Sequence, residues 1–328
     1  MQSFDYERIR ADFLKGPRLN SLLPHFENIA AGRSQAPHKE VLAAPVFLEQ
    51  RSEYKEYHNI FQRNIGQFYK HLCASIPFFV EEQCRLGIAL YKLAQHRLSN
   101  KEAPFTYHET SSADGTNART LAEYAQGLVR TLTDSPNPAN GENFHRLCQH
   151  HYSDIHIGPP TDITPEYLAE RNEHSYFKDG FDVIFENTTF QMYGPNRKAQ
   201  IAYIKRILKE NGLIVFCEKI MHPNYDEYQR REEIKDRFKR IYFTQSEIVQ
   251  KHSQILEEME RCQVTLNSLV DAIHCHFKYA YMIWNSTNFY EVVASNDHAS
   301  LQYFLSYLGQ GYVPEPFLCE KSPIRPLL

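Results

Sequence analysis

Two neighbouring stretches decide the fold: Asp182-Val-Ile-Phe-Glu-Asn-Thr-Thr-Phe-Gln191 and Asn211-Gly-Leu-Ile-Val-Phe-Cys-Glu-Lys219. Each holds a short apolar run of strand type and ends in charged or amide side chains. Residues 196–209 between them have a helical pattern, and Asn211-Gly212 is expected to stop that helix. The order strand, helix, strand predicts a βα unit of a parallel sheet.

The same alternation continues in both directions along the chain. The strands expected besides 181–185 and 213–217 are 104–108, 128–133 and 153–157, with helices near 116–126 and 142–151. Downstream, a charged helical stretch at 225–259 precedes a helix at 264–273 and two strands, 277–284 and 289–294. Five parallel strands and a final antiparallel hairpin predict an α/β fold with a seven-stranded, Rossmann-like sheet and helices on both faces.

The N-terminal part has a different pattern, which divides the chain into three regions. Phe61, Ile65, Phe68 and Leu72 share one helix face, and Pro77 separates this helix from a second one. We therefore expect a mainly helical extension and cap at 1–100 and a ligand-binding domain at 101–296. Within that domain, 225–260 is expected as a helical insertion that completes the cap. Residues 297–328 are expected as a C-terminal tail that ends in a Pro-rich loop.

Composition excludes several classes of function. Of the 328 residues, 42% are apolar and 23% charged, so a packed core is expected rather than disorder. The net charge of −4 and the absence of long basic runs predict no nucleic-acid surface. No run of 18 apolar residues and no signal-peptide core is present, so neither a membrane span nor secretion is expected. The 21 Tyr and 21 Phe residues could line a pocket for a flat ligand or simply fill the core.

Cysteine and histidine usage indicates a cytoplasmic protein without a metal site. The seven Cys residues form no CxxC pair, which is typical of reduced thiols. The groups His274-Cys-His276 and Cys148-Gln-His-His151 each lack a second, spaced pair of ligands, so no metal is predicted.

Candidate site residues follow the strands, because open α/β sheets bind ligands at the carboxyl ends of their strands. The first strand leads into a small, polar loop, His108-Glu-Thr-Ser-Ser-Ala-Asp-Gly115, which could approach a ligand closely or be an ordinary turn. Asp134 follows the second strand, where a ribose diol is commonly held, although it could also be a turn residue. Asp162 and Ile163 follow the third strand and could hold an adenine or belong to the cap of the next helix.

The fourth and fifth strands give the clearest signals. Glu186, Asn187 and Gln191 follow a buried strand, where packing does not require charged or amide side chains. Glu218 and Lys219 end the next strand and could belong to a site, to a turn or to a local ion pair. Polar residues at five strand ends in the expected order favour a ligand site over coincidence.

These residues resemble the class I S-adenosylmethionine-dependent methyltransferase superfamily and, within it, the carboxy-S-adenosyl-L-methionine synthase family. The likeness runs over about residues 58–296 and is strongest in the two stretches quoted first. Further matching segments are Ser75-Ile-Pro-Phe-Phe79, Gly87, Phe238-Lys-Arg240, Gln250-Lys-His-Ser253 and Asn288-Phe289.

The resemblance implies S-adenosyl-L-methionine as cofactor and a role for each matching residue. The implied cofactor-binding residues are Glu109, Thr110, Ser111 and Gly115 at the methionine part, Asp134 and Ser135 at the ribose, Asp162 and Ile163 at the adenine, and Asn187 beside the sulfonium. The implied substrate contacts are Phe79, Gln191, Arg240 and Trp284. Candidates for a catalytic base or acceptor contact are His252, Tyr242 and Glu186. A small-molecule substrate and a homodimer are also expected.

Three departures from the family separate the possible functions. His252 stands where the family has an Arg that pairs with a carboxylate, Phe79 replaces a Tyr, and Ser111 replaces a Gly. A neutral His lacks the permanent charge and two-pronged geometry of Arg. The favoured hypothesis is therefore methyl transfer from plain S-adenosylmethionine to a small molecule. The alternatives are a carboxy-S-adenosylmethionine synthase-like enzyme, or another transfer from that cofactor, and a non-catalytic protein that keeps the fold.

Overall fold

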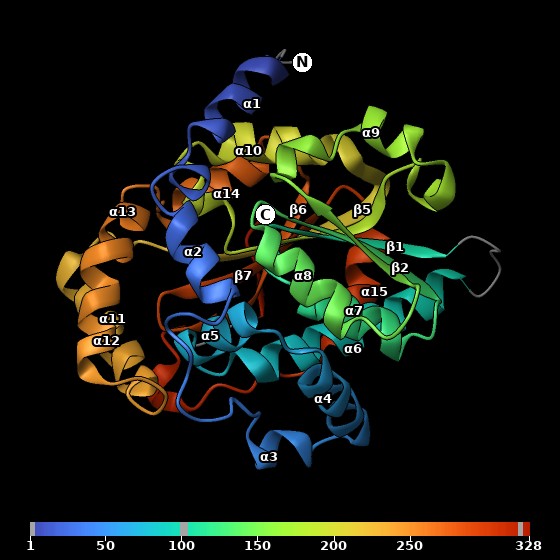
Figure 1. The fold of residues 1–328 in the computed structure, drawn as a ribbon. Coiled ribbons are helices and arrows are strands. Elements are labelled where there is room, and N and C mark those ends of the chain that lie inside the picture. Colours follow the sequence, from blue (N-terminus) through green and yellow to red (C-terminus); the bar gives the residue numbers. More distant parts are fainter. Residues whose placement is uncertain (1–3, 99–103, 321–323) are drawn as a thin grey trace.

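The computed structural model describes residues 4–98, 104–320 and 324–328, and it contains one mixed sheet (Figure 1). The strand order is β3-β2-β1-β4-β5-β7-β6-β8. Strands β1 to β5 are parallel, and β7 runs antiparallel to β5 and β6. The strands are β1 (Phe105–Thr110), β2 (Val129–Ser135), β3 (Ser153–Ile157), β4 (Phe181–Asn187), β5 (Leu208–Lys219), β6 (Tyr279–Ser286), β7 (Phe289–Ser295) and β8 (Arg325–Pro326).

The sheet has eight strands, so the prediction of seven is corrected. The additional strand, β8, pairs antiparallel with β6 through Tyr281–Pro326 and Met282–Arg325. A two-residue strand has no alternating pattern that a sequence could reveal. Proline is tolerated there because β8 lies at the sheet edge, where a missing N–H breaks no ladder.

Helices pack on both faces of the sheet, as predicted. Along β4 and β5, Val183 and Val215 belong to one apolar cluster, whereas Ile184 and Ile214 belong to the other. This alternation is the two-residue period of a strand buried on both sides. Helices α4, α6, α7 and α15 cover the first face, and α1, α10 and α14 cover the second (Figure 1). These helices are α4 (Ser52–Asn64), α6 (Phe79–Leu98), α7 (Thr116–Tyr124), α15 (His298–Leu308), α1 (Tyr6–Leu14), α10 (Arg197–Ile204) and α14 (Leu266–His274).

Several element boundaries differ from the predicted ones. Strands β1, β2, β4 and β5 extend to Thr110, Ser135, Asn187 and Lys219, so polar residues expected in loops are the last residues of strands. Asn211-Gly212 does not stop a helix, because α10 has already ended and β5 has begun at Leu208. The short helix α8 (Pro138–Leu147) begins before the expected position because Pro138 suits the first helical turn.

Several of the remaining helices, from the N-terminal segment and from the insertion after β5, pack against one another. Helix α2 contacts α5 and α8, and α11 contacts α5, which brings N-terminal and inserted segments side by side (Figure 1). The helices are α2 (Leu23–Ala30), α3 (Pro45–Leu48), α5 (Gln67–Ser75), α9 (Pro165–Glu170), α11 (Tyr225–Lys239), α12 (Gln245–Lys251), the π-helix η6 (His252–Leu256) and α13 (Glu257–Glu260). The short 3-10 turns are η1 (Pro17–Leu19), η2 (Pro160–Asp162), η3 (Asn172–Phe177), η4 (Phe190–Met192), η5 (Lys205–Ile207) and η7 (Glu315–Phe317).

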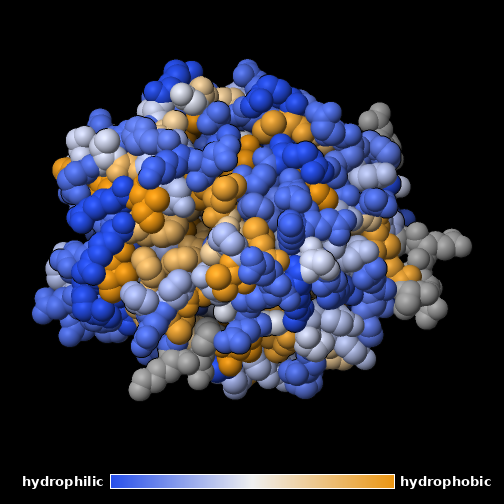
Figure 2. Space-filling view, turned by 90° about the horizontal axis from the view of Figure 1, so that it is seen from below, coloured by the Kyte–Doolittle hydropathy of each residue, from blue (hydrophilic) through white to orange (hydrophobic). Residues whose placement is uncertain are grey.

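Helices α1 to α3 lie within the first 50 residues, in the region expected to be mainly helical. The expected tail 297–328 contains helix α15, which the sequence did not indicate. The expected boundary between residues 100 and 101 lies outside the described residues. Hydrophilic residues predominate on the face seen from below, with apolar residues showing between them (Figure 2).

Candidate functional site

The site lies where the strand order reverses. From β1 the chain proceeds outward to β2 and β3, and it then returns to β4 on the other side of β1. Ligands of open α/β sheets bind at such a switch point, beyond the carboxyl ends of the strands. Here those ends are Thr110 of β1 and Asn187 of β4, two of the predicted site residues.

Strained backbone marks both strand ends. After β1, Ser111 and Ala113 have φ values of 47° and 58°, and after β4 Thr188 has a φ of 54°. Residues other than glycine rarely adopt this left-handed backbone conformation, and those that do are often found at functional sites. Gly115 has a φ of 70°, and this position has no room for a side chain, because a Cβ there would lie 2.9 Å from Phe144 Cδ2. The predicted loop is therefore a shaped element that leads into α7.

Glu109 is the centre of a buried polar network. Its Oε1 accepts hydrogen bonds from Asn187 Nδ2 at 2.9 Å and Asn117 Nδ2 at 3.1 Å. Asn187 also donates to the Tyr69 hydroxyl at 3.0 Å, and Asn117 donates to Gln83 Oε1 at 2.6 Å. Burial raises the pKa of Glu109 to about 8, although both amides favour its charged form. Among the described residues, Oε2 of Glu109 and Oδ1 of Asn187 find no hydrogen-bond partner.

Asp134 forms the second polar centre, at the end of β2. Its Oδ2 accepts a hydrogen bond from Ser111 Oγ at 3.2 Å, and its Oδ1 lies 3.6 Å from His108 Nε2. Burial raises the pKa of Asp134 to about 8, while Ser111 and the nearby Arg18 oppose the rise. Within the described residues, Asp134 Oδ1 accepts no hydrogen bond. The two predicted residues Ser111 and Asp134 thus meet in space.

Arg18 enters this site from the N-terminal segment. Its buried guanidinium lies over the ring of Phe26, with Cζ 4.6 Å from the ring centroid. With Tyr69, Ser111 and Asn187 it lines a cavity of about 20 Å³ at the switch point, called here the strand-end cavity. No sequence signal identified Arg18, because it stands in an irregular segment with no local pattern.

Four other predicted cofactor residues lie beside the strand ends and contact neighbouring residues of the chain. Thr110 hydrogen-bonds with Thr189 at 3.2 Å, and Ser135 Oγ accepts from Asn140 Nδ2 at 2.9 Å. Asp162 is half-buried and accepts from Arg10 at 3.3 Å. Ile163 is buried beside it in the second apolar cluster. These residues border the strand ends without lining the strand-end cavity.

Glu186 holds the backbone after β4. Its Oε1 accepts from the backbone N–H groups of Thr189 at 2.6 Å and Phe190 at 2.7 Å. Burial, and next the charge of Glu218, raise the pKa of Glu186 well above its ordinary value. Glu218 itself pairs with Arg197, whose Nε lies 2.6 Å from Oε1. The geometry gives Glu186 a positioning role for the η4 turn.

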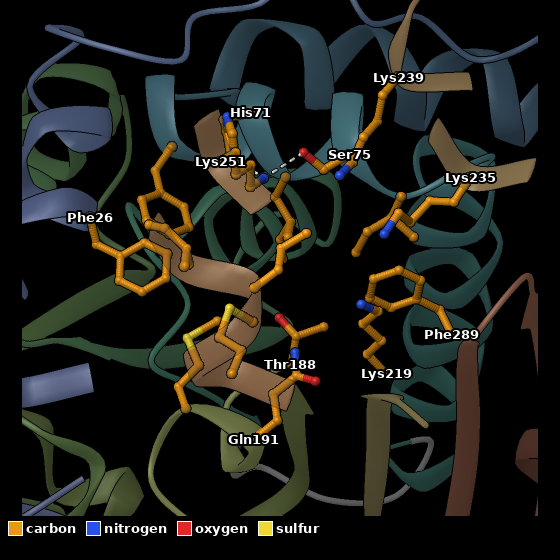
Figure 3. Close-up of a pocket in the computed structure, with 17 residues that line it drawn as sticks. Phe26, His71, Ser75, Thr188, Gln191, Lys219, Lys235, Lys239, Lys251 and Phe289 are labelled. Atoms are coloured by element: carbon orange, nitrogen blue, oxygen red, sulfur yellow. Dashed lines mark hydrogen bonds between the residues drawn. The ribbon is translucent and has the colours of Figure 1, made fainter. Parts of the chain in front are cut away.

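A second cavity, called here the lysine cavity, adjoins the first (Figure 3). Its volume is about 60 Å³, and Phe68, Leu72, Thr188 and Met192 line both cavities. Lys219, Lys235, Lys239 and Phe289 lie on one side of it and Phe26 on the other, whereas Lys251 lies beside His71 and Ser75 (Figure 3). Gln191, a predicted substrate contact, also lines it, and its Oε1 has no partner among the described residues.

The other predicted residues lie outside both cavities. His252 is exposed, and the neighbouring Lys251 is the side chain that enters the lysine cavity. Arg240 is exposed and donates to Gln245 at 3.0 Å, and Tyr242 packs on Phe238 at 5.4 Å between ring centroids. Phe79 and Trp284 are buried against each other, with ring centroids 6.3 Å apart. They support Tyr69 from behind, since Phe79 also stacks on that ring.

Within residues 4–98, 104–320 and 324–328, no group of three or more His, Cys, Asp and Glu side chains is arranged to hold a metal ion. None of the helices described is at once long and apolar enough to cross a membrane.

Comparisons with known proteins gave similar structures only. No protein-family model and no curated protein matches the chain. One similar solved structure is the plantazolicin methyltransferase BpumL in complex with a monoazolic desmethylPZN analog and SAH, at 11% identity and a TM-score of 0.45, covering 88% of this chain and 98% of that one. A putative O-methyltransferase from Nostoc punctiforme has 12% identity and a TM-score of 0.39 over 87% and 71%. The cyclopropane synthase MmaA2 from Mycobacterium tuberculosis has 12% identity and a TM-score of 0.41 over 73% and 78%.

Proposed function

We propose that this chain binds S-adenosyl-L-methionine at the switch point and transfers its methyl group to a small molecule. The observation that carries the proposal is the set of polar side chains beyond β1, β2 and β4. Glu109, Asp134 and Asn187 come from three strands, and each keeps one buried oxygen without a partner among the described residues. Buried polar atoms are normally hydrogen-bonded, so unpaired acceptors at a ligand-binding edge indicate a polar ligand.

The donor and acceptor set fits this cofactor. Glu109 and Asn187 would hold the methionine part, whose ammonium supplies hydrogens to unpaired oxygens. Asp134 would accept from the ribose hydroxyls, with Asp162 and Ile163 toward the adenine. When bound, the cofactor supplies an electrophilic methyl group on a sulfonium. The chain's contribution is to orient both reactants and to exclude water, which is the main requirement of an in-line displacement.

The cofactor needs more room than the strand-end cavity offers in this conformation. Sites for molecules of this size enclose about 300 Å³ or more, compared with about 20 Å³ here. Arg18 and Phe68 on the cavity wall belong to the helical segments that precede the sheet domain. We therefore infer that these segments move outward to admit the cofactor and then close over it.

Two side chains that can accept a proton lie on the wall of the lysine cavity. Lys251 and His71 line that cavity, whereas His252, Tyr242 and Glu186 do not. Burial and the neighbouring cations hold the pKa of Lys251 and that of His71 well below their ordinary values. A neutral amine or imidazole can take up a proton when the substrate binds, so we place the proton-accepting role on this pair instead of His252.

A second candidate function is carboxy-S-adenosylmethionine synthesis or a related transfer. The observation in its favour is Lys251, a half-buried lysine that lines the adjoining cavity one residue before the position expected for the carboxylate-binding Arg. Mass spectrometry of nucleosides that co-purify with the protein separates the two functions. Plain S-adenosylmethionine or S-adenosylhomocysteine supports methyl transfer, and a carboxylated nucleoside supports the second candidate.

Calorimetry with S-adenosylmethionine and S-adenosylhomocysteine tests the proposed cofactor site. We expect both to bind, and Asn187→Ala to weaken binding by about 10-fold or more, the usual effect of losing a hydrogen bond to a charged group. Asn59→Ala on the exposed face of α4 is the matched control and should leave affinity unchanged. Near-ultraviolet circular dichroism checks that each variant is folded. Failure of the wild-type chain to bind either nucleoside would favour a non-catalytic role.

A further inference from the structure

The lysine cavity combines the amines of four lysines from three elements, three of them buried and one, Lys251, half-buried. Lys219 comes from β5, Lys235 and Lys239 from α11, and Lys251 from the end of α12. The side chains of Lys219, Lys235 and Lys239 are 2%, 3% and 3% exposed. Lysine is almost never buried without a partner, so this grouping requires a physical explanation.

The acidic groups facing these amines do not balance their charge. Among the described ion-pair partners of these four lysines, Glu232 is the only well-buried acid. It pairs with both Lys219, at 2.8 Å, and Lys235. Asp236 lies 3.5 Å from Lys239 and is 27% exposed. Glu260 lies 3.9 Å from Lys219 and is 22% exposed. One buried carboxylate and two partly solvated ones thus face four amines.

Lys251 has no acidic partner in the described part of the chain. Its Nζ lies 3.0 Å from Ser75 Oγ and 2.5 Å from His71 Nε2. His71 donates through Nδ1 to the Gln35 carbonyl at 2.9 Å, which leaves Nε2 as an acceptor and not as a second cation. Ser75 and His71 therefore fix the amine in place without neutralising a charge on it.

A buried, uncompensated ammonium has two stable outcomes: it loses its proton, or an anion binds beside it. Burial and the neighbouring amines keep the pKa of Lys251 well below its ordinary value, and they lower that of Lys239 to about 7. The free chain therefore holds part of the cluster neutral. An anion bound in the cavity would raise the pKa values of these amines, so that they take up protons from solvent.

The rest of the cavity wall is mostly apolar, which indicates an apolar body for the ligand. The π-helix η6 follows Lys251 directly, and it contributes Ile255 and Leu256 to the cavity. The other apolar lining residues are Phe26, Phe68, Leu72, Ile76, Met192, Met259 and Phe289. A ligand with one anionic end and an apolar body matches both parts of this wall.

We propose that the lysine cavity binds the carboxylate of the acceptor substrate, and that this acceptor is a small, apolar carboxylic acid. The inference rests on the proposed function in calling this ligand the acceptor, but its binding chemistry does not depend on the cofactor. Thr188 and Met192 line both cavities, so a molecule anchored on the lysines extends toward the strand-end cavity. The cavity thus sets the substrate class of the same site.

Binding of the carboxylate is coupled to proton uptake. A carboxylate beside Lys251 and Lys239 favours their charged forms and raises their pKa values, so protons are taken up near pH 7 and affinity falls as pH rises. The titratable groups that face these two amines from neighbouring elements are Lys219, Lys235, Glu232, Asp236, Glu260, His71 and His25.

Calorimetry with hexanoate and its neutral isostere hexanamide, in the absence of nucleoside, tests the proposal. We expect hexanoate to bind at least about 10-fold more tightly than hexanamide, as charged hydrogen bonds require. Titration in two buffers of different ionisation enthalpy should show proton uptake at pH 7. Equal binding of the two ligands, or tighter binding of inorganic phosphate than of hexanoate, would overturn the proposal.

Lys251→Met and Lys239→Met locate the binding site. Each should weaken hexanoate binding by about 10-fold, whereas Lys55→Met on the exposed face of α4 should not change it. Removing a buried cation is compatible with folding, and thermal melts check this for each variant. Unchanged hexanoate affinity in both cavity variants would contradict the assignment.

Two further measurements separate this proposal from the proposed function. S-adenosylhomocysteine titrations report on the strand-end cavity alone. If the wild-type chain binds hexanoate but not this nucleoside, the methyltransferase proposal is rejected and the carboxylate-site proposal stands. The reverse result keeps the cofactor site and rejects the carboxylate site. A carboxylated nucleoside that co-purifies, and that hexanoate displaces, would assign the lysines to the cofactor and overturn the substrate proposal.

Discussion

Buried groups of opposite charge type lie beside the two adjoining cavities. Glu109 and Asp134, at the carboxyl ends of β1 and β2, contact the wall of the strand-end cavity through Asn187 and Ser111, and burial raises the pKa of each acid to about 8. On the wall of the lysine cavity, burial and mutual repulsion lower the pKa values of Lys239 and Lys251. In both places burial favours the neutral forms of these groups. A ligand that brings a cation to the acids, or an anion to the amines, would favour their charged forms.

The largest effect should come from Glu109→Gln, which separates the two cavities. This change removes the carboxylate from the network but keeps its shape and its amide partners. We expect S-adenosylhomocysteine to bind about 10- to 100-fold more weakly, because a charge-assisted hydrogen bond is lost. Hexanoate affinity should stay the same. Calorimetry with both ligands checks this, and a parallel loss of both affinities would mean that the cavities are not independent.

Gly115→Ala should damage the strand-end cavity through the backbone. The position has a φ of 70°, and a Cβ would lie 2.9 Å from Phe144. The expected loss is about 1–3 kcal/mol in the free energy of unfolding, from strain and overpacking together. Urea denaturation measures it. Gly32→Ala is the control for the same left-handed φ without crowding, since Gly32 has a φ of 69° and its Cβ would meet no atom closer than 3.7 Å. Equal losses in the two variants would exclude a packing role for Gly115.

Asp134→Asn sharpens the comparison through pH. The folded pKa of Asp134, about 8, exceeds the ordinary value of 3.8. Its contribution to stability is therefore complete below about pH 4 and is lost as pH rises through 8. Between pH 5 and 8 the wild type should lose stability relative to Asp134→Asn, by about 1 kcal/mol for each pH unit. Chemical denaturation at several pH values measures the difference, and parallel pH profiles would show that Asp134 is charged in the folded chain.

Lys239→Met should show the opposite, smaller dependence. The folded pKa of about 7 lies below the ordinary 10.5, so the unfolded chain binds more protons between these values. The penalty from Lys239 is complete below pH 7, and stability is regained as pH rises toward 10.5. Relative to Lys239→Met, the wild type should therefore gain stability over this range, by up to about 1 kcal/mol for each pH unit. A flat difference between the two denaturation profiles would rule out a neutral Lys239.

The sequence predicted the strand-end cavity better than the lysine cavity, for a physical reason. Parallel strands all end at one edge of the sheet, so Glu109, Asp134 and Asn187 converge once the strands are correctly identified. The sequence also indicated the loop before Gly115. It did not indicate Tyr69, Gln83 or Arg18, whose positions depend on how the N-terminal helices cross that edge.

The second cavity and the orientation of its lysines depend on the tertiary structure. Lys235 and Lys239 lie on α11, whose charged sequence has the appearance of a solvated helix, although both amines are buried. Lys251 rather than His252 enters the cavity because successive residues of a helix differ by about 100° in direction. The sequence by itself determined the α/β sheet and its polar strand ends, since these depend on local periodicity. The lysine cavity depends on the packing of α11, α12 and α5 against the sheet, which no local pattern encodes.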